Sequence, residues 1–518
     1  MKKNRGVVLI SLIVALGGFL MGFDASVISG VVKFLEPEFN LTKLELGWAV
    51  SSLTLTSTLA MMFAGPLSDK YGRKLLLSYS AVLYAISALA SAVAPTFFLL
   101  VIARMIGGFG VGVSLIIAPM YIAEISPAHL RGRMVSFNQL NIVIGISAAF
   151  FTNFLILKLG QSDTEWVRML KFDDYNWRWM LGIETLPAIM YFFALFIVPR
   201  SPRWLIMKGK YDEAYKILTK TRTPENANAE INEVKASMMT GTEKTKTSLK
   251  DLFKPIMRLV LVIGVVIAVL QQITGINSVF FYAPMIFEQS GIGTDAAFSQ
   301  AIYVGLTNLI FTIVAIGLID KLGRKPLLTY GVAAIAVFMF LLAYSFSTAT
   351  YTLTDEAINA LPEEVKIEQI YQIKDLPYDS DISFKAALNE ALGKELAQKY
   401  ESDLIKNAIH ANSFLILIGI LGFVAAFAIS LGPVMWVLFS ELFPNRIRGL
   451  AISFVGLINS GISFLVQLVF PWELSTLGTG STFLIYGIFA VLGLAFILAK
   501  VPETKGKTLE ELEKILIR

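Results

Sequence analysis

The chain has 518 residues, of which 55% are hydrophobic and 16% are charged, and its formal net charge is +5. A soluble protein of this composition could not cover its surface with polar groups, and the modest charge does not indicate a nucleic-acid surface. The lack of cysteine excludes disulfides, thiol nucleophiles and cysteine metal sites, while His129 and His410 have no partner at a metal-ligand spacing. We therefore expect a membrane protein with no metal, no cofactor and no nucleic-acid partner.

Apolar stretches of about 20 residues recur along the chain, and each is long enough to cross roughly 30 Å of hydrocarbon as a helix. Twelve such spans are predicted, at about 7–33, 46–66, 75–94, 97–119, 134–157, 177–198, 257–289, 299–319, 326–348, 411–439, 450–470 and 480–500. An even number of spans puts both termini on one side of the bilayer. The Lys- and Arg-rich segments MKKNR, SDKYGRK, HLRGR, DKLGRK and RIR all fall on that side, which predicts cytoplasmic termini.

The first span, LIVALGGFLMGFDASVISG, contains a carboxylate, Asp24. A charge at the centre of a span costs on the order of 3 kcal/mol, so it usually has a function. Counted from the outer ends of their spans, Asp24, Arg104 and Glu184 lie at a similar depth of roughly 10–14 Å. An arginine beside two acids can keep one carboxylate ionised and leave the other near neutral, which suits a proton site. A structural ion pair that locks the helices together is the alternative.

Two polar segments interrupt the spans. The segment 199–256 is predicted to be a cytoplasmic helical linker, which leaves residues 1–198 and 257–518 as two bundles of six helices. The segment 349–410 lies on the opposite side of the membrane and has the pattern of short amphipathic helices. We interpret it as a solvated insert without a role in transport.

The seventh span contains three amides, Gln271, Gln272 and Asn277, in the stretch LQQITGINSVFFYAP. Amides in an apolar span are costly unless they have partners, and each can both donate to and accept from a hydroxyl group. On a regular helix these side chains would point in different directions. Gly275 and Pro284 predict a distorted helix on which they converge, as at the binding sites of transporters with broken helices. Hydrogen bonds between helices are the alternative.

The two halves of the chain share motifs, which indicates an internal duplication. The run SDKYGRK at 68–74 recurs as DKLGRK at 320–325. The motif AEISPAHLRGR holds Glu124 and Arg131 at the same spacing as Glu441 and Arg448 in SELFPNRIRGL. Parallel repeats of six spans are typical of one architecture of secondary transporters.

These motifs, with QQITGIN and the closing VPETKG, resemble the sugar porter family of the major facilitator superfamily, and most of all its bacterial proton-linked pentose and hexose symporters. The resemblance covers nearly the whole chain except 349–410. It implies an all-α integral membrane protein with twelve transmembrane helices in two pseudo-symmetric six-helix bundles. It also implies a monomer in the bacterial inner membrane, and a transporter rather than an enzyme.

The resemblance assigns roles to individual residues. Asp24 and Arg104 match the proton-coupling pair of the family, and Glu184 matches a glutamate that modulates it. The residues that match sugar contacts, with Asn459 in place of a glutamine, are Gln139, Gln271, Gln272, Asn277, Asn308, Trp436 and Asn459. The residues that match the cytoplasmic gating network are Asp69, Arg73, Glu124, Arg131, Asp320, Arg324, Glu441 and Arg448.

The chain departs from the family pattern at a few positions. Arg200 stands where the P-E-S-P-R motif has glutamate, which questions any latch that uses that carboxylate. Leu431 and Ser460 stand where the xylose-type carriers have tryptophan, so the expected pocket is less aromatic and a different or larger polyol is possible.

The sequence thus predicts a secondary active transporter that imports a pentose, a hexose or a related polyol, with the proton as its coupling ion. A sugar facilitator without proton coupling is the first alternative. A sugar sensor with a transporter fold is the second, although such sensors usually carry a long cytoplasmic tail.

Overall fold

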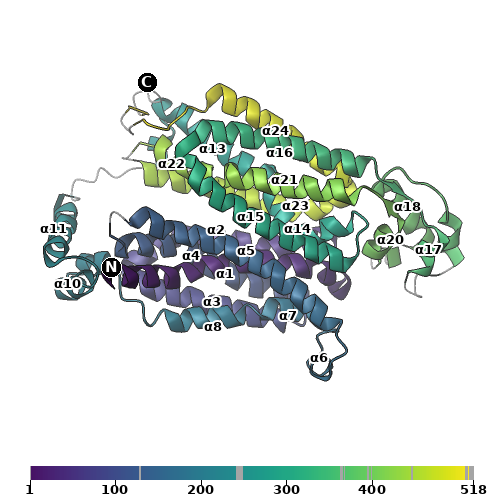
Figure 1. Ribbon diagram of the computed structural model, residues 1–518, viewed down its shortest axis with the longest axis horizontal. Helices are drawn as coiled ribbons and strands as arrows, with labels where there is room; N and C mark the ends of the chain where they lie inside the picture. Colours follow the sequence, from purple (N-terminus) through teal and green to yellow (C-terminus); the bar gives the residue numbers. More distant parts are fainter. Residues whose placement is uncertain are drawn as a thin grey trace. The chain divides into compact units, whose positions relative to one another are not determined.

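The computed structural model describes residues 2–127, 130–240, 249–361, 366, 368–393, 396–397, 400–444, 447–507 and 511–512. His129 and parts of the predicted linker and insert lie outside these residues. Most of the described chain is helical (Figure 1).

Long apolar helices make up most of the structure, and eleven in the described chain are long and apolar enough to cross a membrane. Those of the first half are α1 (Lys2–Phe39), α2 (Lys43–Tyr71), α3 (Arg73–Ala92), α4 (Phe97–Ile125) and α5 (Arg131–Gly160). Those of the second half are α13 (Arg258–Ile273) with α14 (Ile276–Glu288), α15 (Thr294–Leu322), α16 (Arg324–Ser347), α21 (Ser413–Ile429) with α22 (Leu431–Leu442), α23 (Arg448–Thr476) and α24 (Thr479–Lys500).

The predicted sixth span is divided into two short helices, α7 (Asn176–Gly182) and α8 (Thr185–Ala194). Neither piece is long enough to cross a bilayer alone, because about 20 residues are needed. Only Ile183 and Glu184 separate them. With this interrupted span, the helices account for the twelve spans that the sequence predicts.

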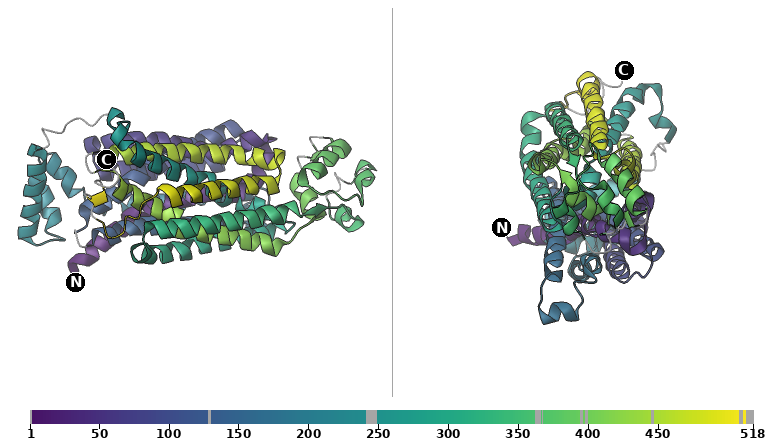
Figure 2. Two further views of the ribbon diagram at one scale, coloured as in Figure 1. Left: turned by 90° about the horizontal axis from the view of Figure 1, so that it is seen from above. Right: turned by 90° about the vertical axis from the view of Figure 1, so that its right-hand side faces the viewer.

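Shorter helices connect the spans. Before α7 lies α6 (Glu165–Met169), and the segment between α8 and α13 contains α9 (Pro202–Met207), α10 (Tyr211–Leu218), α11 (Pro224–Thr240), α12 (Leu249–Leu252) and η2 (Pro255–Met257). Helices α9 to α11 enclose a small apolar core of their own that includes Leu205, Ala214 and Leu218. Figure 2 shows α10 and α11 beyond one end of the long helices of their own compact unit.

The insert folds as a small lobe. Strands β1 (Thr350–Tyr351) and β2 (Ile409–His410) pair antiparallel where the lobe joins α16 and α21, with Thr350 opposite His410. Between them lie α17 (Asp355–Asn359), η4 (Glu368–Ile373), α18 (Asp381–Leu392) and α20 (Glu401–Ala408). Phe384 and Leu404 are fully buried in a core that belongs to the lobe. The insert is therefore more than a string of solvated helices (Figure 1).

The chain forms two compact units. Unit 1 comprises residues 1–27, 52–149 and 177–248, and unit 2 comprises 28–51, 150–176 and 249–518. The division passes through α1, α2 and α5, so one end of each of these helices packs with the helices of the second half. The two six-helix bundles at 1–198 and 257–518 stay a prediction.

Small residues let helices approach closely inside unit 1. The run GGFGVG on α4 includes Gly108 and Gly112, and a Cβ atom at either position would collide with the backbone carbonyl of Leu53 or Ser57 on α2. Close packing of this kind is typical of helices in membranes. It fixes α4 against α2 one turn beyond Arg104.

Candidate functional site

The predicted proton-coupling residues lie together in unit 1. Arg104 Nη1 donates to Asp24 Oδ1 at 3.3 Å, and Arg104 Nη2 donates to the Asp24 carbonyl oxygen at 3.4 Å. Glu184 is close enough to interact electrostatically with both. All three residues are 2% exposed. The structure thus places one cation and two carboxylates in one buried group.

Each of these side chains keeps an unsatisfied polar atom. Asp24 Oδ2, Arg104 Nε and Glu184 Oε1 are buried without a hydrogen-bond partner among the described residues. An ionised carboxylate only accepts hydrogen bonds, and it becomes a donor when it binds a proton. A buried carboxylate oxygen without a partner is therefore a place where a proton can bind. A Cβ atom at Gly107 would lie 2.9 Å from Asp24 Oδ2, so glycine keeps the space beside that oxygen open.

The local sequence explains how the helices present these groups. Thr96 caps α4, because its hydroxyl accepts a hydrogen bond from the Leu99 N–H at 3.4 Å, and this sets the start of the helix that carries Arg104. Glu184 lies in the turn between α7 and α8, where the helix is interrupted. Tyr84 on α3 is fully buried within electrostatic reach of both acids, and sequence reasoning missed it. A tyrosine inside the apolar third span was the available signal.

The predicted amide residues converge in unit 2. Asn459 Nδ2 donates to Gln271 Oε1 at 2.9 Å, and Gln272 Nε2 donates to Asn459 Oδ1 at 3.2 Å. Asn277 Nδ2 donates to Gln272 Oε1 at 2.8 Å. Two elements of the seventh span and α23 thus contribute to one amide cluster, which we define as Gln271, Gln272, Asn277 and Asn459.

A break in the seventh span makes this convergence possible. Helix α13 ends at Ile273, and Gly275 adopts a left-handed conformation with φ of 87° before α14 begins. The ring of Tyr486 packs against Gly275 and would collide with a Cβ atom there. A second irregularity follows at Tyr282, two residues before Pro284, with φ of −124° and ψ of 15°. The prediction of a distorted seventh span is confirmed.

The amide cluster continues along α23. Asn277 Nδ2 donates to Ser463 Oγ at 2.6 Å, and Gln467 Nε2 donates to the same oxygen at 2.8 Å. Sequence reasoning missed Ser463 and Gln467. Their spacing was the signal, because Asn459, Ser463 and Gln467 recur every four residues and so form one polar stripe on the helix.

The other three predicted sugar contacts lie apart from these hydrogen bonds. Gln139 is exposed on α5 in unit 1. Asn308 is buried on α15, and Trp436 on α22 packs edge-to-face against Phe439 with ring centroids 5.9 Å apart. Among the described residues of unit 2, neither Asn308 nor Trp436 hydrogen-bonds to the amide cluster.

The predicted gating residues form a charge network in unit 1. Arg73 binds Asp69 through Nη1 at 2.9 Å and Glu124 through Nη2 at 3.0 Å. The Ser201 hydroxyl donates to the second oxygen of Glu124 at 2.5 Å. Arg131 instead donates to the carbonyl oxygen of Ala123 at 3.1 Å.

Unit 2 repeats this arrangement. Arg324 binds Asp320 at 3.2 Å and Glu441 at 2.7 Å, and the Thr504 hydroxyl donates to Glu441 at 2.6 Å. Arg448, like Arg131, donates to a backbone carbonyl oxygen, here that of Phe443 at 3.0 Å. In each repeat an arginine therefore lies between two acids, and a hydroxyl group donates a hydrogen bond to the second oxygen of the glutamate.

Glu503 is a member of the second network that sequence reasoning missed. It accepts hydrogen bonds from the backbone N–H groups of Arg324 and Lys325, both at 3.1 Å, and so caps the start of α16. Burial alone would raise the pKa of Glu503, but these N–H groups and that of Lys505 outweigh it and lower the pKa. The signal was the match of VPETKG with the sequence VPRSPR at 198–203.

Arg200 occupies the position in the first half that corresponds to Glu503. Its guanidinium lies 5.9 Å from the centre of the Trp204 ring. That ring covers Gly72 at the start of α3, where the second half has the Glu503 carboxylate. The two halves thus differ here, with an aromatic ring beside Gly72 and a carboxylate beside Gly323.

Comparisons with known proteins agree with this architecture. The family described as "Sugar (and other) transporter" matches residues 10–361 and 397–516. The arabinose-proton symporter of Bacillus subtilis is 34% identical over 512 residues, which cover 99% of this chain and 95% of that protein. The D-xylose-proton symporter of Escherichia coli is 35% identical over 538 residues, which cover 98% and 95%. A solved structure of the proton:xylose symporter XylE with 6-bromo-6-deoxy-D-glucose has a TM-score of 0.69 at 33% identity, covering 99% of this chain and 100% of that one.

Proposed function

The chain belongs to the sugar transporter family of the major facilitator superfamily, and on that premise we propose that it imports a monosaccharide or a related polyol by proton symport with alternating access. The observation that carries this proposal is the buried Asp24–Arg104 ion pair with its unpaired carboxylate oxygen. Both named relatives are proton-linked symporters of pentoses.

Asp24 is the proposed proton acceptor. When it is ionised, the charge of Arg104 holds it at 3.3 Å. When it binds a proton, the attraction to Arg104 falls, and the energy of the arrangement of α1 and α4 changes with it. Coupling requires this kind of difference between states, because a ligand shifts a conformational equilibrium only by its differential affinity. Glu184, in the turn between α7 and α8, adds a second carboxylate that competes for the same arginine.

The amide cluster is the proposed sugar site, with Gln139, Asn308 and Trp436 as further contacts. Amides suit a sugar because each can satisfy a hydroxyl as donor and acceptor. The break at Gly275 supports this role, since broken helices carry substrate sites in such transporters.

The two charge networks are the proposed gates. They lie at the helix ends that the Lys and Arg pattern assigns to the cytoplasm, which is also the proposed side of both termini. A network that forms in one state and breaks in another biases the transport equilibrium, even where each pair alone contributes little. We further propose a monomer in a bacterial inner membrane, where one proton gains about 2.3 kcal/mol per 100 mV.

The test is the external pH of de-energised vesicles on addition of pentoses, hexoses or inositols, with wild type and Asp24→Asn compared. Symport predicts alkalinisation with the transported sugar and none with Asp24→Asn, which should still exchange labelled sugar. If labelled sugar equilibrates in wild type without proton movement, the Asp24–Arg104 pair is structural and the protein is a facilitator.

A further inference from the structure

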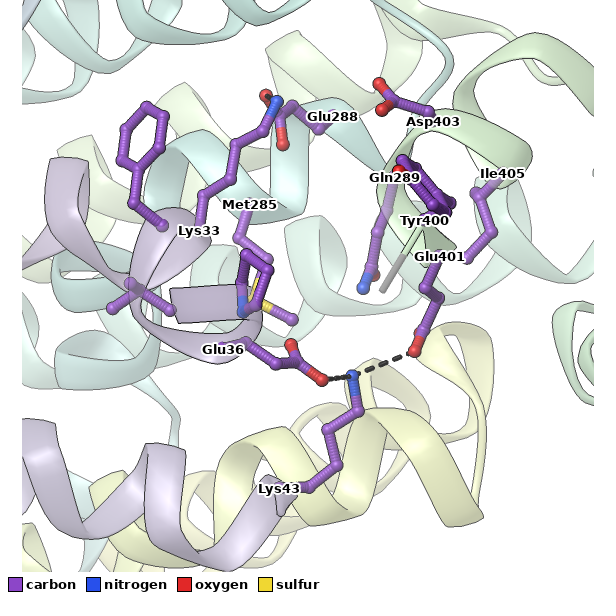
Figure 3. A pocket seen from close by; sticks show the side chains of 13 residues that line it. Lys33, Glu36, Lys43, Met285, Glu288, Gln289, Tyr400, Glu401, Asp403 and Ile405 are labelled. Atoms are coloured by element: carbon purple, nitrogen blue, oxygen red, sulfur yellow. Dashed lines mark hydrogen bonds and ion pairs between the residues drawn. The ribbon is translucent and has the colours of Figure 1, made fainter. Parts of the chain in front are cut away.

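The insert is bound to the first two helices by a chain of ion pairs. Lys43, the first residue of α2, binds Glu36 of α1 at 2.6 Å and Glu401 of α20 at 2.9 Å (Figure 3). Lys385 of α18 binds the other oxygen of Glu401 at 3.1 Å. These four residues, all in unit 2, are called the outer latch below.

The outer latch borders a cavity of about 240 Å³. Its walls come from the end of α1, from Met285 and Glu288 on α14, and from Tyr400 and Glu401 at the start of α20 (Figure 3). On the far wall, Lys33 of α1 binds Glu288 at 2.7 Å and Thr294 at 2.6 Å. The end of α1 thus contacts the seventh span through Lys33 and is linked to the insert through Lys43 of α2.

The outer latch is shielded from solvent. The side chain of Lys43 is 13% exposed and those of Glu36 and Glu401 are each 18% exposed. Pairs on an open surface contribute little, whereas removal of one partner from a shielded pair leaves an uncompensated charge. Removal of one partner should therefore raise the free energy of the state that contains the contact.

The lobe is attached to the second half by independent bonds. Besides the β1–β2 junction with α16 and α21, Asp381 accepts hydrogen bonds from the N–H and hydroxyl of Thr479 at 3.1 and 3.3 Å. The lobe is therefore joined to the second half, whereas Glu36 and Lys43 reach it from α1 and α2, whose other ends lie in unit 1.

One residue of the outer latch lies outside the family match. Lys385 lies in the segment 362–396, which the family match omits. Lys43, Glu36 and Glu401 lie within the matched residues, so the latch joins matched helices to the insert.

We propose that Lys43 and Glu401 are positioning residues of the transport cycle, whose ion pair holds the outer ends of α1 and α2 against the insert and breaks each time the carrier opens to the outside. This rests on the proposed alternating access and orientation. It makes the insert part of the transport machinery. Loss of the pair then raises the fraction of carriers that are open to the outside.

The first measurement is the accessibility of the cavity to a membrane-impermeant maleimide. The chain has no cysteine, so Met285→Cys supplies a single thiol in the cavity wall. Adding Lys43→Met should raise the labelling rate about 3- to 10-fold, which corresponds to a shift in the conformational equilibrium of that size. Lys43→Arg, which keeps the ion pair, should restore the slow rate. Loss of a nearby cation by itself makes a thiol less reactive, so an increase reports opening.

A matched control lies inside the insert. Lys374 binds Asp355 at 2.6 Å within the lobe, so Lys374→Met removes an insert ion pair and leaves the outer latch intact. It should not change labelling. Glu401→Gln removes the same bond as Lys43→Met from the insert side and should give the same increase. Unchanged labelling in both Lys43→Met and Glu401→Gln, or an equal increase in Lys374→Met, overturns the proposal.

Transport kinetics provide a second readout that a merely structural role would not move. Without the latch, KM for external sugar should fall and KM for internal sugar should rise, because the equilibrium moves toward the outward-open state. A lesion that only lowers the amount of folded protein changes the maximal rate and neither KM. Labelling requires no sugar, so faster labelling in a protein that moves no sugar would sustain the outer latch and refute the proposed function.

Discussion

Removal of the Glu503 carboxylate should destabilise the second half of the chain through the start of α16. This side chain accepts from the N–H groups of Arg324 and Lys325 at 3.1 Å each, in the first turn of a helix of 24 residues. The glycine before that helix, Gly323, has no side chain to provide a cap. In Glu503→Ala, the two N–H groups would therefore lose their acceptor.

The expected cost follows from two contributions. A lost N-terminal cap costs about 1 kcal/mol, within a range of about 0.5–2 kcal/mol. A carboxylate beside a helix N-terminus adds about 0.3–1 kcal/mol at a partly exposed site such as this one. Glu503→Ala should thus lower the free energy of unfolding by about 1–2 kcal/mol, and Glu503→Gln by less, because the amide oxygen still accepts.

Thermal unfolding of the purified protein in detergent, followed by tryptophan fluorescence, measures this effect. Because the entropy of unfolding grows with chain length, 1–2 kcal/mol in a chain of 518 residues lowers Tm by roughly 1–2 °C. Arg200→Ala is the control, since Arg200 holds the corresponding position in the first half and caps no helix. If Glu503→Ala unfolds at the wild-type temperature, or Arg200→Ala is equally unstable, the proposed capping role of Glu503 is wrong.

Three further changes test other parts of the structure. Gly275→Ala should lower the free energy of unfolding by at least about 1–2 kcal/mol, because alanine is strained at φ of 87° and its Cβ meets the Tyr486 ring. An unchanged free energy of unfolding would contradict the left-handed conformation of Gly275 between α13 and α14. Gln272→Leu should weaken sugar binding at least about tenfold by titration calorimetry, since it removes amide bonds and leaves buried partners unpaired; unchanged affinity would remove the amide cluster from the sugar site. The pKa of Glu401 is about 2, because Lys385 and Lys43 outweigh the effect of burial, so its contribution to stability should be complete above its ordinary pKa of 4.5 and disappear as pH falls toward 2. The difference in unfolding midpoint between wild type and Glu401→Gln, measured from pH 6 to pH 2, should shrink over that interval, and a difference independent of pH would contradict the ion pairs.

The sequence predicts the spans well because polar backbone and side chains are so costly in hydrocarbon. The same cost makes rare polar residues informative, which is why Asp24, Arg104 and the amides of the seventh span could be selected without a structure. Gly275 and Pro284 also predicted the break, because glycine readily adopts positive φ and proline lacks the N–H that a regular helix needs.

Other features depend on contacts that spacing along the chain does not reveal. The gating network implied by the family resemblance includes Glu124 and Arg131, but the Arg131 guanidinium donates to a backbone carbonyl, and Arg73 binds the Glu124 carboxylate. The hydroxyl of Ser201 could not be identified because serine is common and its partner lies far away in sequence. The insert has the composition of a solvated segment, yet it folds around its own core and binds α2 through Lys43.

The mutual hydrogen bonds of the amide cluster have a consequence for its proposed role as the sugar site. Gln271, Gln272, Asn277 and Asn459 satisfy one another by hydrogen bonds. An arriving hydroxyl must replace these bonds rather than fill empty ones, so each exchange yields only a fraction of a free hydrogen bond's energy. If the amide cluster binds the sugar as proposed, this exchange should make binding weaker and release faster than at a site whose amides are unpaired.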